Sequence, residues 1–245
     1  MDGCEPMTHQ GSSFGVLVLH GFTGSPYSMR GVADALANAG FSVEMPLLPG
    51  HGTSIEDMLP TRFDDWSEAA EAAFQSLSSR VERVGILGLS MGGTLTCWLA
   101  ERHPEVAGIV CVNALVEYPG EEFVSSIRGV LDAGLEVLEG LGSDIKKPGV
   151  EERAYAETPV APLVSLLEAV EGVGGNLGAI SCPVLSFTSV EDHVVAPPNG
   201  EFLALMAGGP VERVLLEDSY HVATLDNDAQ LVEAQSVAFF ERLSQ

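Results

Sequence analysis

The sequence is poor in basic residues. Its 245 residues include 11 Lys and Arg against 35 Asp and Glu, which gives a formal net charge of −24. Only two of the basic residues are lysines, Lys146 and Lys147. Binding to nucleic acid needs clustered cations, and an acidic surface also repels anionic lipids and strongly anionic ligands. We therefore expect no nucleic-acid partner, and we interpret the charge as a contribution to solubility or to salt tolerance.

Cysteines and long apolar runs are also scarce. The four cysteines, Cys4, Cys97, Cys111 and Cys182, form no CxxC pair and lack the spacing of metal ligands. This pattern is typical of buried free thiols in a reducing compartment. No apolar run approaches the ~20 residues that span a bilayer, and no basic segment followed by an apolar one opens the chain. The expected location is the cytoplasm.

Motifs for metals and cofactors are missing as well. His20, His51 and His221 are not spaced as a ligand set, and the sequence has no HExxH, no helix-opening GxGxxG and no Walker sequence. We therefore expect a protein whose chemistry needs neither a metal nor a cofactor.

What the sequence does have is ample core material in an alternating pattern. Hydrophobic residues make up 46% of the chain, and a length of 245 residues suits one large α/β domain. Short β-branched runs alternate with longer amphipathic ones, which predicts a mostly parallel sheet with helices on both faces. Strands are predicted at residues 14–19, 41–45, 84–89, 108–113, 184–188 and 211–216, and helices at 29–38, 67–77, 92–102 and 227–243.

The alternation lapses between residues 114 and 181. Helical patches such as Glu121 to Leu138 are separated there by glycines and prolines. We interpret this stretch as an inserted cap, so the predicted plan is a core formed by residues 1–113 and 182–245 with a cap at 114–181.

The strongest local motif is Gly88-Leu89-Ser90-Met91-Gly92, directly after a buried strand and directly before a helix. Glycines two positions either side of a serine allow strand and helix to pack closely while the turn exposes the hydroxyl. A bare GxSxG match arises often by chance, but this strand–turn–helix context predicts that Ser90 is a nucleophile.

A serine hydroxyl needs a base, and the base needs a carboxylate that orients it. After such a motif the acid precedes the histidine in the chain. His221 follows the last predicted strand and is the predicted base, whereas His193 lies next to the acid and His103 lies far from the site. Asp192 follows strand 184–188 and is the predicted acid, with Glu191 and Asp218 as competitors.

Acyl transfer also needs donors for the oxyanion. The predicted donors are the backbone N–H groups of Met91, next to the nucleophile, and of Phe22, in the loop after the first predicted strand. His20 in that loop is interpreted as a bracing residue.

The chain resembles the bacterial monoacylglycerol lipases and related small carboxylesterases of the α/β-hydrolase superfamily. The segments that carry the resemblance span nearly the whole chain: HGFTGSP (20–26), PGHGT (49–53), DDW (64–66), GLSMGG (88–93), GSDIK (142–146), AYxxTPV (154–160), EDHVV (191–195) and SYHVATLDND (219–228). The resemblance implies the same five residues in the triad and oxyanion hole. It further implies that Glu152 binds the glycerol head and that Leu141 lines an acyl tunnel, although a plain cap role is equally compatible with both.

The resemblance implies a serine hydrolase that cleaves monoacylglycerols, with transient membrane or micelle contact through the cap. The first alternative is a broad esterase for short acyl chains. Hydrolases of thioesters or C–C bonds share the same triad, and a hydrolase-fold binding protein without turnover is a further alternative. Residues 116–139 match no pattern of the family, so head-group and chain-length preferences stay open.

Overall fold

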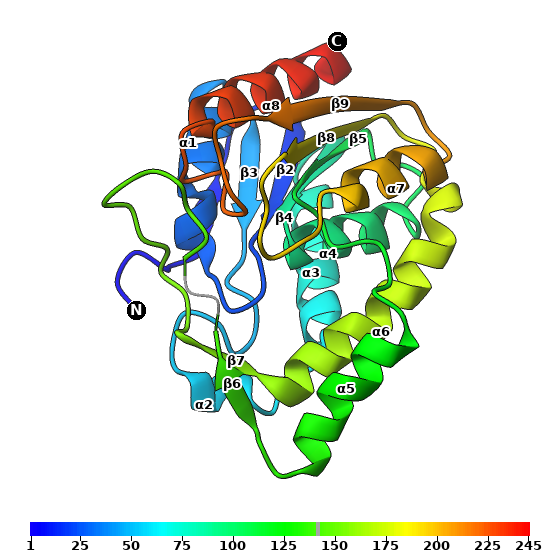
Figure 1. The fold of residues 1–245 in the computed structure, drawn as a ribbon. Helices are drawn as coiled ribbons and strands as arrows, with labels where there is room; N and C mark the ends of the chain where they lie inside the picture. The colour runs from blue at the N-terminus through cyan, green and yellow to red at the C-terminus, as the bar shows by residue number, and fades with distance from the viewer. Residues whose placement is uncertain (141–142) are drawn as a thin grey trace.

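The computed structural model describes residues 1–140 and 143–245. Its centre is a seven-stranded sheet in the order β1-β3-β2-β4-β5-β8-β9, in which only β1 pairs antiparallel (Figure 1). The strands are β1 (Met7–His9), β2 (Phe14–Leu19), β3 (Ser42–Met45), β4 (Arg83–Leu89), β5 (Gly108–Val112), β8 (Val184–Ser189) and β9 (Val211–Leu216). The predicted α/β class with a mostly parallel sheet is confirmed.

Helices cover both faces of this sheet. On one face α1 (Arg30–Asn38) packs against α8 (Ala229–Ser244), and on the other α3 (Phe63–Ser78) packs against α4 (Met91–Ala100). Each face has its own apolar core, one around Trp66 and Leu95 and the other around Val32 and Phe240. The helix α7 (Pro198–Met206) lies against β8 and β9, and the four-residue α2 (Ile55–Met58) precedes α3.

Two predicted helices have different bounds in the structure. The predicted helix 67–77 begins earlier, at Phe63, because the Asp65 side chain caps its first turn, where Asp65 Oδ2 accepts from Arg62 N (2.7 Å). The predicted helical patch Glu121 to Leu138 is wrong beyond Asp132. There α5 (Glu121–Asp132) ends, two residues before Gly134, whose φ of +85° favours glycine.

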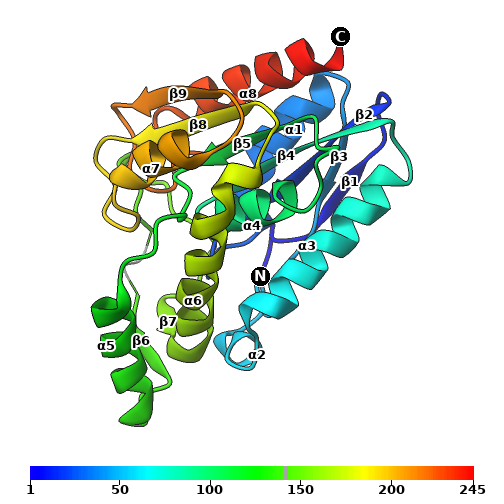
Figure 2. The same cartoon turned by 90° about the vertical axis from the view of Figure 1, so that its right-hand side faces the viewer.

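Between β5 and β8, the described residues form two α-helices and a pair of short antiparallel strands, which lie below the sheet in Figure 1. These are α5, β6 (Val137–Glu139), β7 (Glu157–Pro159) and α6 (Val160–Asn176), with β6 and β7 antiparallel. Figure 2 shows α6 between α4 and the outer α5, and α6 contacts both. We call residues 114–181 the cap segment.

The cap segment is joined to the core by apolar packing. Leu166, Val170 and Val173 of α6, and Leu177 directly after it, belong to the same core cluster as Trp66. The cap segment is therefore fixed over the carboxyl ends of the parallel strands, where an open α/β sheet builds its site. Within the described residues, no helix is both long enough and apolar enough to cross a bilayer.

Candidate active site

Ser90 sits in the turn between β4 and α4 with a backbone that is rare outside glycine (φ 56°, ψ −118°). The flanking glycines are required by close contacts. A Cβ at Gly88 would lie 2.0 Å from Gly92 O, and one at Gly92 would lie 2.2 Å from Leu19 O. Strand and helix can therefore cross beneath the serine only with glycine at both positions, as the motif predicts.

Asp192 and His221 are brought together by the loops after β8 and β9. His221 Nδ1 and Asp192 Oδ2 are 2.8 Å apart, and both side chains are buried. Asp192 Oδ1 also accepts from the backbone N–H groups of Val194 (2.9 Å) and Val195 (2.8 Å). These bonds fix the carboxylate, which in turn orients the imidazole.

Ser90 and His221 line the same cavity. Among the hydrogen bonds of residues 1–140 and 143–245, none joins the Ser90 hydroxyl to the His221 ring. Such a bond is often long in a resting enzyme and tightens when substrate binds.

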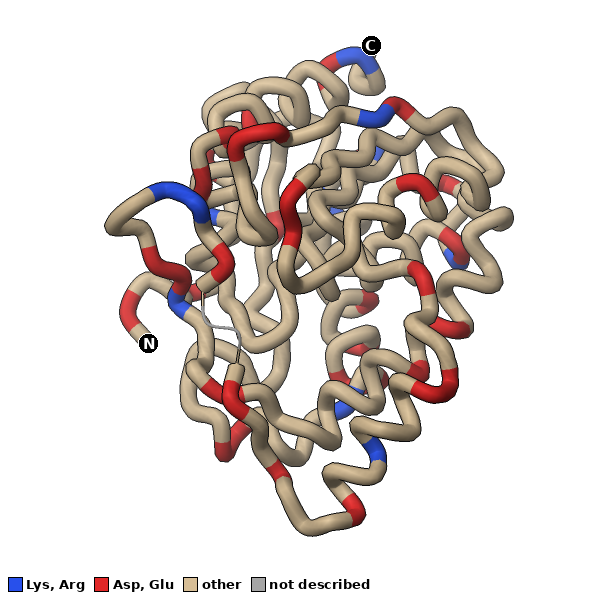
Figure 3. The backbone as a smooth tube through the Cα atoms, in the orientation of Figure 1, with Lys and Arg blue, Asp and Glu red and all other residues tan. Residues whose placement is uncertain are grey.

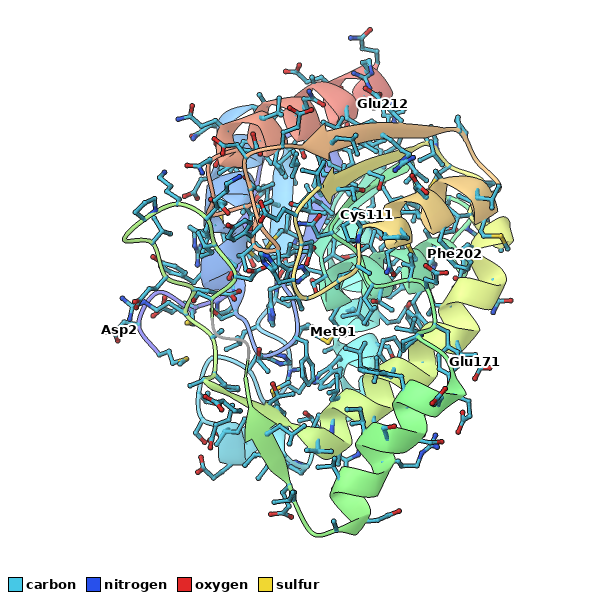
Figure 4. All side chains as sticks on the ribbon, in the orientation of Figure 1. Asp2, Met91, Cys111, Glu171, Phe202 and Glu212 are labelled. Atoms are coloured by element: carbon cyan, nitrogen blue, oxygen red, sulfur yellow. The ribbon has the colours of Figure 1, made fainter. Side chains whose placement is uncertain are left out.

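Phe22 and Met91, the predicted oxyanion donors, are both near Ser90: Phe22 lines the same cavity, and Met91 is the next residue in the chain. Met91 is the first residue of α4, and Figure 4 shows it near the middle of the molecule. The loop of Phe22 is close to Ser90, since a Cβ at Gly21 would lie 3.4 Å from Ser90 Cβ. In the described part of the chain, neither the Phe22 nor the Met91 backbone N–H donates to another backbone group.

His20 braces the loop that carries Phe22. Its Nε2 accepts from Leu48 N (3.1 Å), so Nδ1 carries the proton and donates to Gly21 O (3.0 Å). Burial and the neighbouring His51 lower the pKa of His20 to about 3. The residue is therefore neutral, and it is committed to the loop rather than to the cavity.

The cavity has a volume of about 720 Å³, within the usual range for small-molecule sites. Near Ser90 it is lined by polar groups, among them Thr23, Asp144 and Glu152. The cap segment contributes six apolar side chains to the lining: Phe123, Ile127, Leu138, Leu163, Leu166 and Leu167. It also contributes the polar residues Glu117, Tyr118, Glu139 and Thr158, so the cavity beside the serine has both apolar and polar lining.

Glu152 lies at the polar end. Its Oε1 accepts from Ser28 Oγ (2.5 Å), and burial raises the pKa of its carboxyl. A Cβ at Gly24 would lie 2.8 Å from this oxygen, so glycine there makes room for the carboxylate. Leu141, the other residue expected to contact substrate, lies outside the described residues.

The residues that competed for a catalytic role have other partners. Glu191 and Asp218 are exposed and face Lys146 Nζ at 3.8 and 3.4 Å. His103 pairs with Glu71 Oε2 (2.8 Å) at the end of α4 distant from Ser90. His193 pairs with Asp144 (2.8 Å), which agrees with its interpretation as a structural residue.

Two polar residues around His221 were not anticipated. Asn113, at the end of β5, donates to His221 O (2.7 Å), and Asp144 accepts from His221 N (3.1 Å). The only signal in the sequence was indirect. Asp144 lies in the GSDIK segment, and Asn113 is the last residue of the predicted strand 108–113, at the carboxyl end where site residues gather.

Comparison with known proteins settles the family. The chain is 43% identical to the thermostable monoacylglycerol lipase of Bacillus sp. (strain H-257), over 99% of this chain and 96% of that protein. A family model described as the alpha/beta hydrolase fold matches residues 16–136. The chain is an α/β-hydrolase. The hydrolase is also 27% identical to the carboxylesterase of Bacillus subtilis (strain 168), over 98% of this chain and 97% of that protein.

Solved structures agree with this assignment. A chain reported under the metagenome-derived lipolytic enzymes LipS and LipT superposes on the hydrolase with a TM-score of 0.94 at 43% identity, covering 99% of both chains. The monoacylglycerol lipase of Paleococcus ferrophilus superposes with a TM-score of 0.77 at 18% identity, covering 97% of this chain and 98% of that one. At 18% identity this second likeness concerns the fold alone.

Proposed function

We propose that this hydrolase is a serine esterase that cleaves monoacylglycerols into fatty acid and glycerol. The observation that carries the proposal is the buried Asp192–His221 pair, which shares one cavity with Ser90. The 43% identity to a protein named monoacylglycerol lipase supports the substrate class.

In the proposed first half-reaction, Ser90 Oγ attacks the ester carbonyl while His221 takes the serine proton. Asp192 holds the imidazole in the required tautomer through its bond to Nδ1. The carbonyl oxygen becomes an oxyanion between the N–H groups of Phe22 and Met91, each contributing about 2.7–4 kcal/mol of transition-state stabilisation. His221 then protonates the leaving glycerol.

In the second half-reaction, a water molecule gives a proton to His221 and attacks the acyl-enzyme. The same two N–H groups stabilise the second oxyanion. Protonation of Ser90 Oγ by His221 releases the fatty acid and restores the enzyme.

The polar and apolar groups that line the cavity match the glycerol head and the acyl chain of a monoacylglycerol. The apolar side chains of the cap segment accommodate the acyl chain, with Leu141 proposed as a further lining residue. At the polar end the Glu152 carboxylate accepts hydrogen bonds from glycerol hydroxyls. A neutral polyol also avoids the repulsion that an anionic head would meet in an acidic protein.

The Ser90→Ala variant tests the chemistry directly. We expect no measurable release of oleate from monoolein and no labelling by a fluorophosphonate probe, because the nucleophile is gone. Wild-type release by the variant would reject the mechanism. A wild-type protein that the probe does not label would favour a binding protein without turnover.

A broad esterase for short acyl chains is the second candidate, and the likeness to the Bacillus subtilis carboxylesterase favours it. The two candidates differ in kcat/KM for a C4 aryl ester and for C12 to C18 monoacylglycerols. A panel with diacyl and triacylglycerols completes the comparison. A higher kcat/KM for monoacylglycerols supports the first candidate, and a higher value for the C4 ester supports the second.

We further propose that the cap segment makes transient contact with lipid aggregates. Phe123 (50% exposed) and Leu135 (54% exposed) present apolar surface to solvent, and Phe123 also lines the cavity. Because the net charge is −24, contact should occur with zwitterionic and not with anionic vesicles. A Leu135→Ser variant changes exposed apolar surface without touching the cavity lining, so it should lose activity on emulsified substrate and keep it on a soluble ester.

A cytoplasmic location is part of the proposal. All four cysteines are free and buried, as is usual in a reducing compartment.

A further inference from the structure

Asp144 links the cap segment to both loops that carry the proposed acid and base. Its Oδ2 accepts from the backbone N–H of His221 (3.1 Å) and of His193 (3.2 Å), while its Oδ1 faces His193 Nδ1 at 2.8 Å. Its main-chain oxygen accepts from Val222 N (3.1 Å). One residue therefore binds main-chain donors of the loop after β8 and of the loop after β9.

The hydrogen-bond partners of Asp144 are at or next to the proposed acid and base. His193 is the residue after Asp192, and the N–H of His221 belongs to the proposed base itself. The Asp144 side chain is only 12% exposed, and its bond to His221 N is partly buried, whereas its bonds to His193 lie at the exposed surface. A shift of Asp144 would therefore move the acid loop and the base relative to each other.

The backbone carbonyl of His221 is bound by a residue of the core. Asn113 Nδ2 donates to His221 O (2.7 Å) and to Ser189 Oγ (2.9 Å), and Asn113 Oδ1 accepts from Ser189 N (2.8 Å). Ser189 ends β8, three residues before Asp192. The main chain of His221 is thus fixed by Asn113 on one side and by Asp144 on the other.

The segment that follows Asp144 is anchored by the carboxylate of Asp226. Asp226 accepts from Lys146 N (2.7 Å) and Lys147 N (2.8 Å), and the same carboxylate accepts from Tyr220 N (2.9 Å). Asp226 is buried. The stretch before His221 and the stretch after Asp144 therefore share one anchor, which makes the clamp on His221 rigid.

We propose that Asp144 is a positioning residue of the cap segment. Its carboxylate binds the backbone N–H groups of His221 and His193 and so keeps the base and the loop of the acid in a fixed relative position. The inference rests on the proposed function. Displacement of a reacting group by about 1 Å can cost about 100-fold in rate. Loss of the clamp should therefore act on the chemical step much more than on substrate binding.

The central comparison is between Asp144→Ala and Asp144→Asn. Alanine removes every side-chain bond, and kcat on a soluble C4 aryl ester should fall about 10- to 100-fold with KM within about threefold of wild type. In asparagine the amide oxygen can replace Oδ2 as acceptor for both backbone N–H groups. Asp144→Asn should therefore restore most of the lost kcat.

Two further variants isolate the bond to His221. Asp132→Ala removes an exposed carboxylate at the end of α5 in the same cap segment, and it should leave kcat unchanged. His193→Ala removes the imidazole partner of Asp144 but leaves the acceptor for His221 N in place. Its kcat should stay within about threefold of wild type.

Active-site titration with the fluorophosphonate probe expresses kcat per functional site, so a variant that folds incompletely is still measured correctly. A spectroscopic readout accompanies it. The downfield proton signal of His221 Nδ1–H, assigned by its absence in His221→Ala, should broaden or shift in Asp144→Ala and return in Asp144→Asn.

The inference is overturned if Asp144→Ala keeps a wild-type kcat per titrated site, because its role would then be only structural. A loss in His193→Ala equal to that in Asp144→Ala would also overturn it, since the effect would run through the His193 ring. The proposed function fails separately, if Ser90→Ala and His221→Ala remain active. Inactive Ser90→Ala and His221→Ala with a fully active Asp144→Ala reject only the role of Asp144.

Discussion

Backbone strain in this hydrolase is concentrated around the cavity. Among the described residues, the non-glycine positions with positive φ are Thr23 (60°), Ser90 (56°) and Asn113 (45°). Thr23 and Ser90 line the cavity, and Asn113 binds the main chain of His221. Such conformations cost about 1–3 kcal/mol each and persist only where surrounding contacts enforce them. Their clustering is typical of a functional site.

At the residue scale, the first prediction concerns Asp192→Asn. The amide keeps the size of the side chain. If its NH₂ group faces His221 Nδ1, the imidazole proton moves to Nε2, and the ring can no longer accept the serine proton there. We expect kcat on a soluble ester to fall roughly 10⁴-fold, the size of the effect that the wrong tautomer has in a serine protease. Active-site titration and steady-state kinetics measure it.

The neighbouring Glu191→Gln variant is the matched control, because Glu191 is exposed and its ion-pair partners among the described residues are Lys146 and His193. It should keep the wild-type kcat. A loss below about tenfold in Asp192→Asn, or an equal loss in Glu191→Gln, would contradict the assignment of the acid.

A second residue-scale prediction concerns stability at acid pH. Burial lowers the pKa of His20 to about 3 and that of His51 to about 4, from an ordinary value of 6.5. Below pH 6.5 the unfolded chain therefore takes up protons that the folded chain does not, and the free energy of unfolding decreases as the pH falls. Each histidine adds up to about 1.4 kcal/mol per pH unit to this slope, down to its folded pKa.

Urea unfolding at pH 7.5, 6.0 and 5.0 measures the slope. His51→Gln should reduce the slope of the unfolding free energy against pH by the amount that one histidine contributes. Identical slopes for the wild type and the variant would show that His51 is not held neutral by burial.

At the element scale, the turn from β4 to α4 shows how a helix and a strand depend on single glycines. A Cβ on Gly88 would meet Gly92 O at 2.0 Å and Thr96 Oγ1 at 2.5 Å. We expect Gly88→Ala to lower the free energy of unfolding by about 1–3 kcal/mol through overpacking, as urea denaturation would measure.

Gly129 in α5 is the control, since nothing lies within 4 Å of a Cβ built there. Gly129→Ala should raise the free energy of unfolding by up to ~1 kcal/mol because alanine favours helix. A Gly88→Ala variant as stable as Gly129→Ala would refute the packing account of the motif.

Element predictions from the sequence succeeded where apolar runs are strong and failed where packing decides. The six predicted strands all exist, because each is a short apolar or β-branched run. The helices α6 and α7 were not placed, since prolines and glycines interrupt their sequences and packing against the core stabilises them. The edge strand β1 was also missed, because three residues give too little alternation to recognise.

At the scale of the whole molecule, acidic positions are spread along the backbone from the core to the cap segment, and they outnumber the basic positions 35 to 11 (Figure 3). A net charge of −24 destabilises the compact state through self-repulsion. Raising NaCl from 10 to 150 mM shortens the Debye length from ~30 to ~8 Å. We therefore expect Tm to rise over this range, as calorimetry would show.

KCl at equal ionic strength should give the same rise, because screening does not depend on the identity of the cation. A Tm that is constant or falls with salt would show that local ion pairs outweigh the repulsion.

The α/β class, the turn that presents Ser90, and the order of Asp192 and His221 along the chain follow from local periodicity and short motifs, which the sequence contains. The groups that surround these residues follow instead from the packing of distant segments. Along the chain, Asp144 is 77 residues and Asn113 is 108 residues away from His221, whose backbone they bind. Such contacts depend on how the cap segment and the strand ends converge, and no local pattern encodes that convergence.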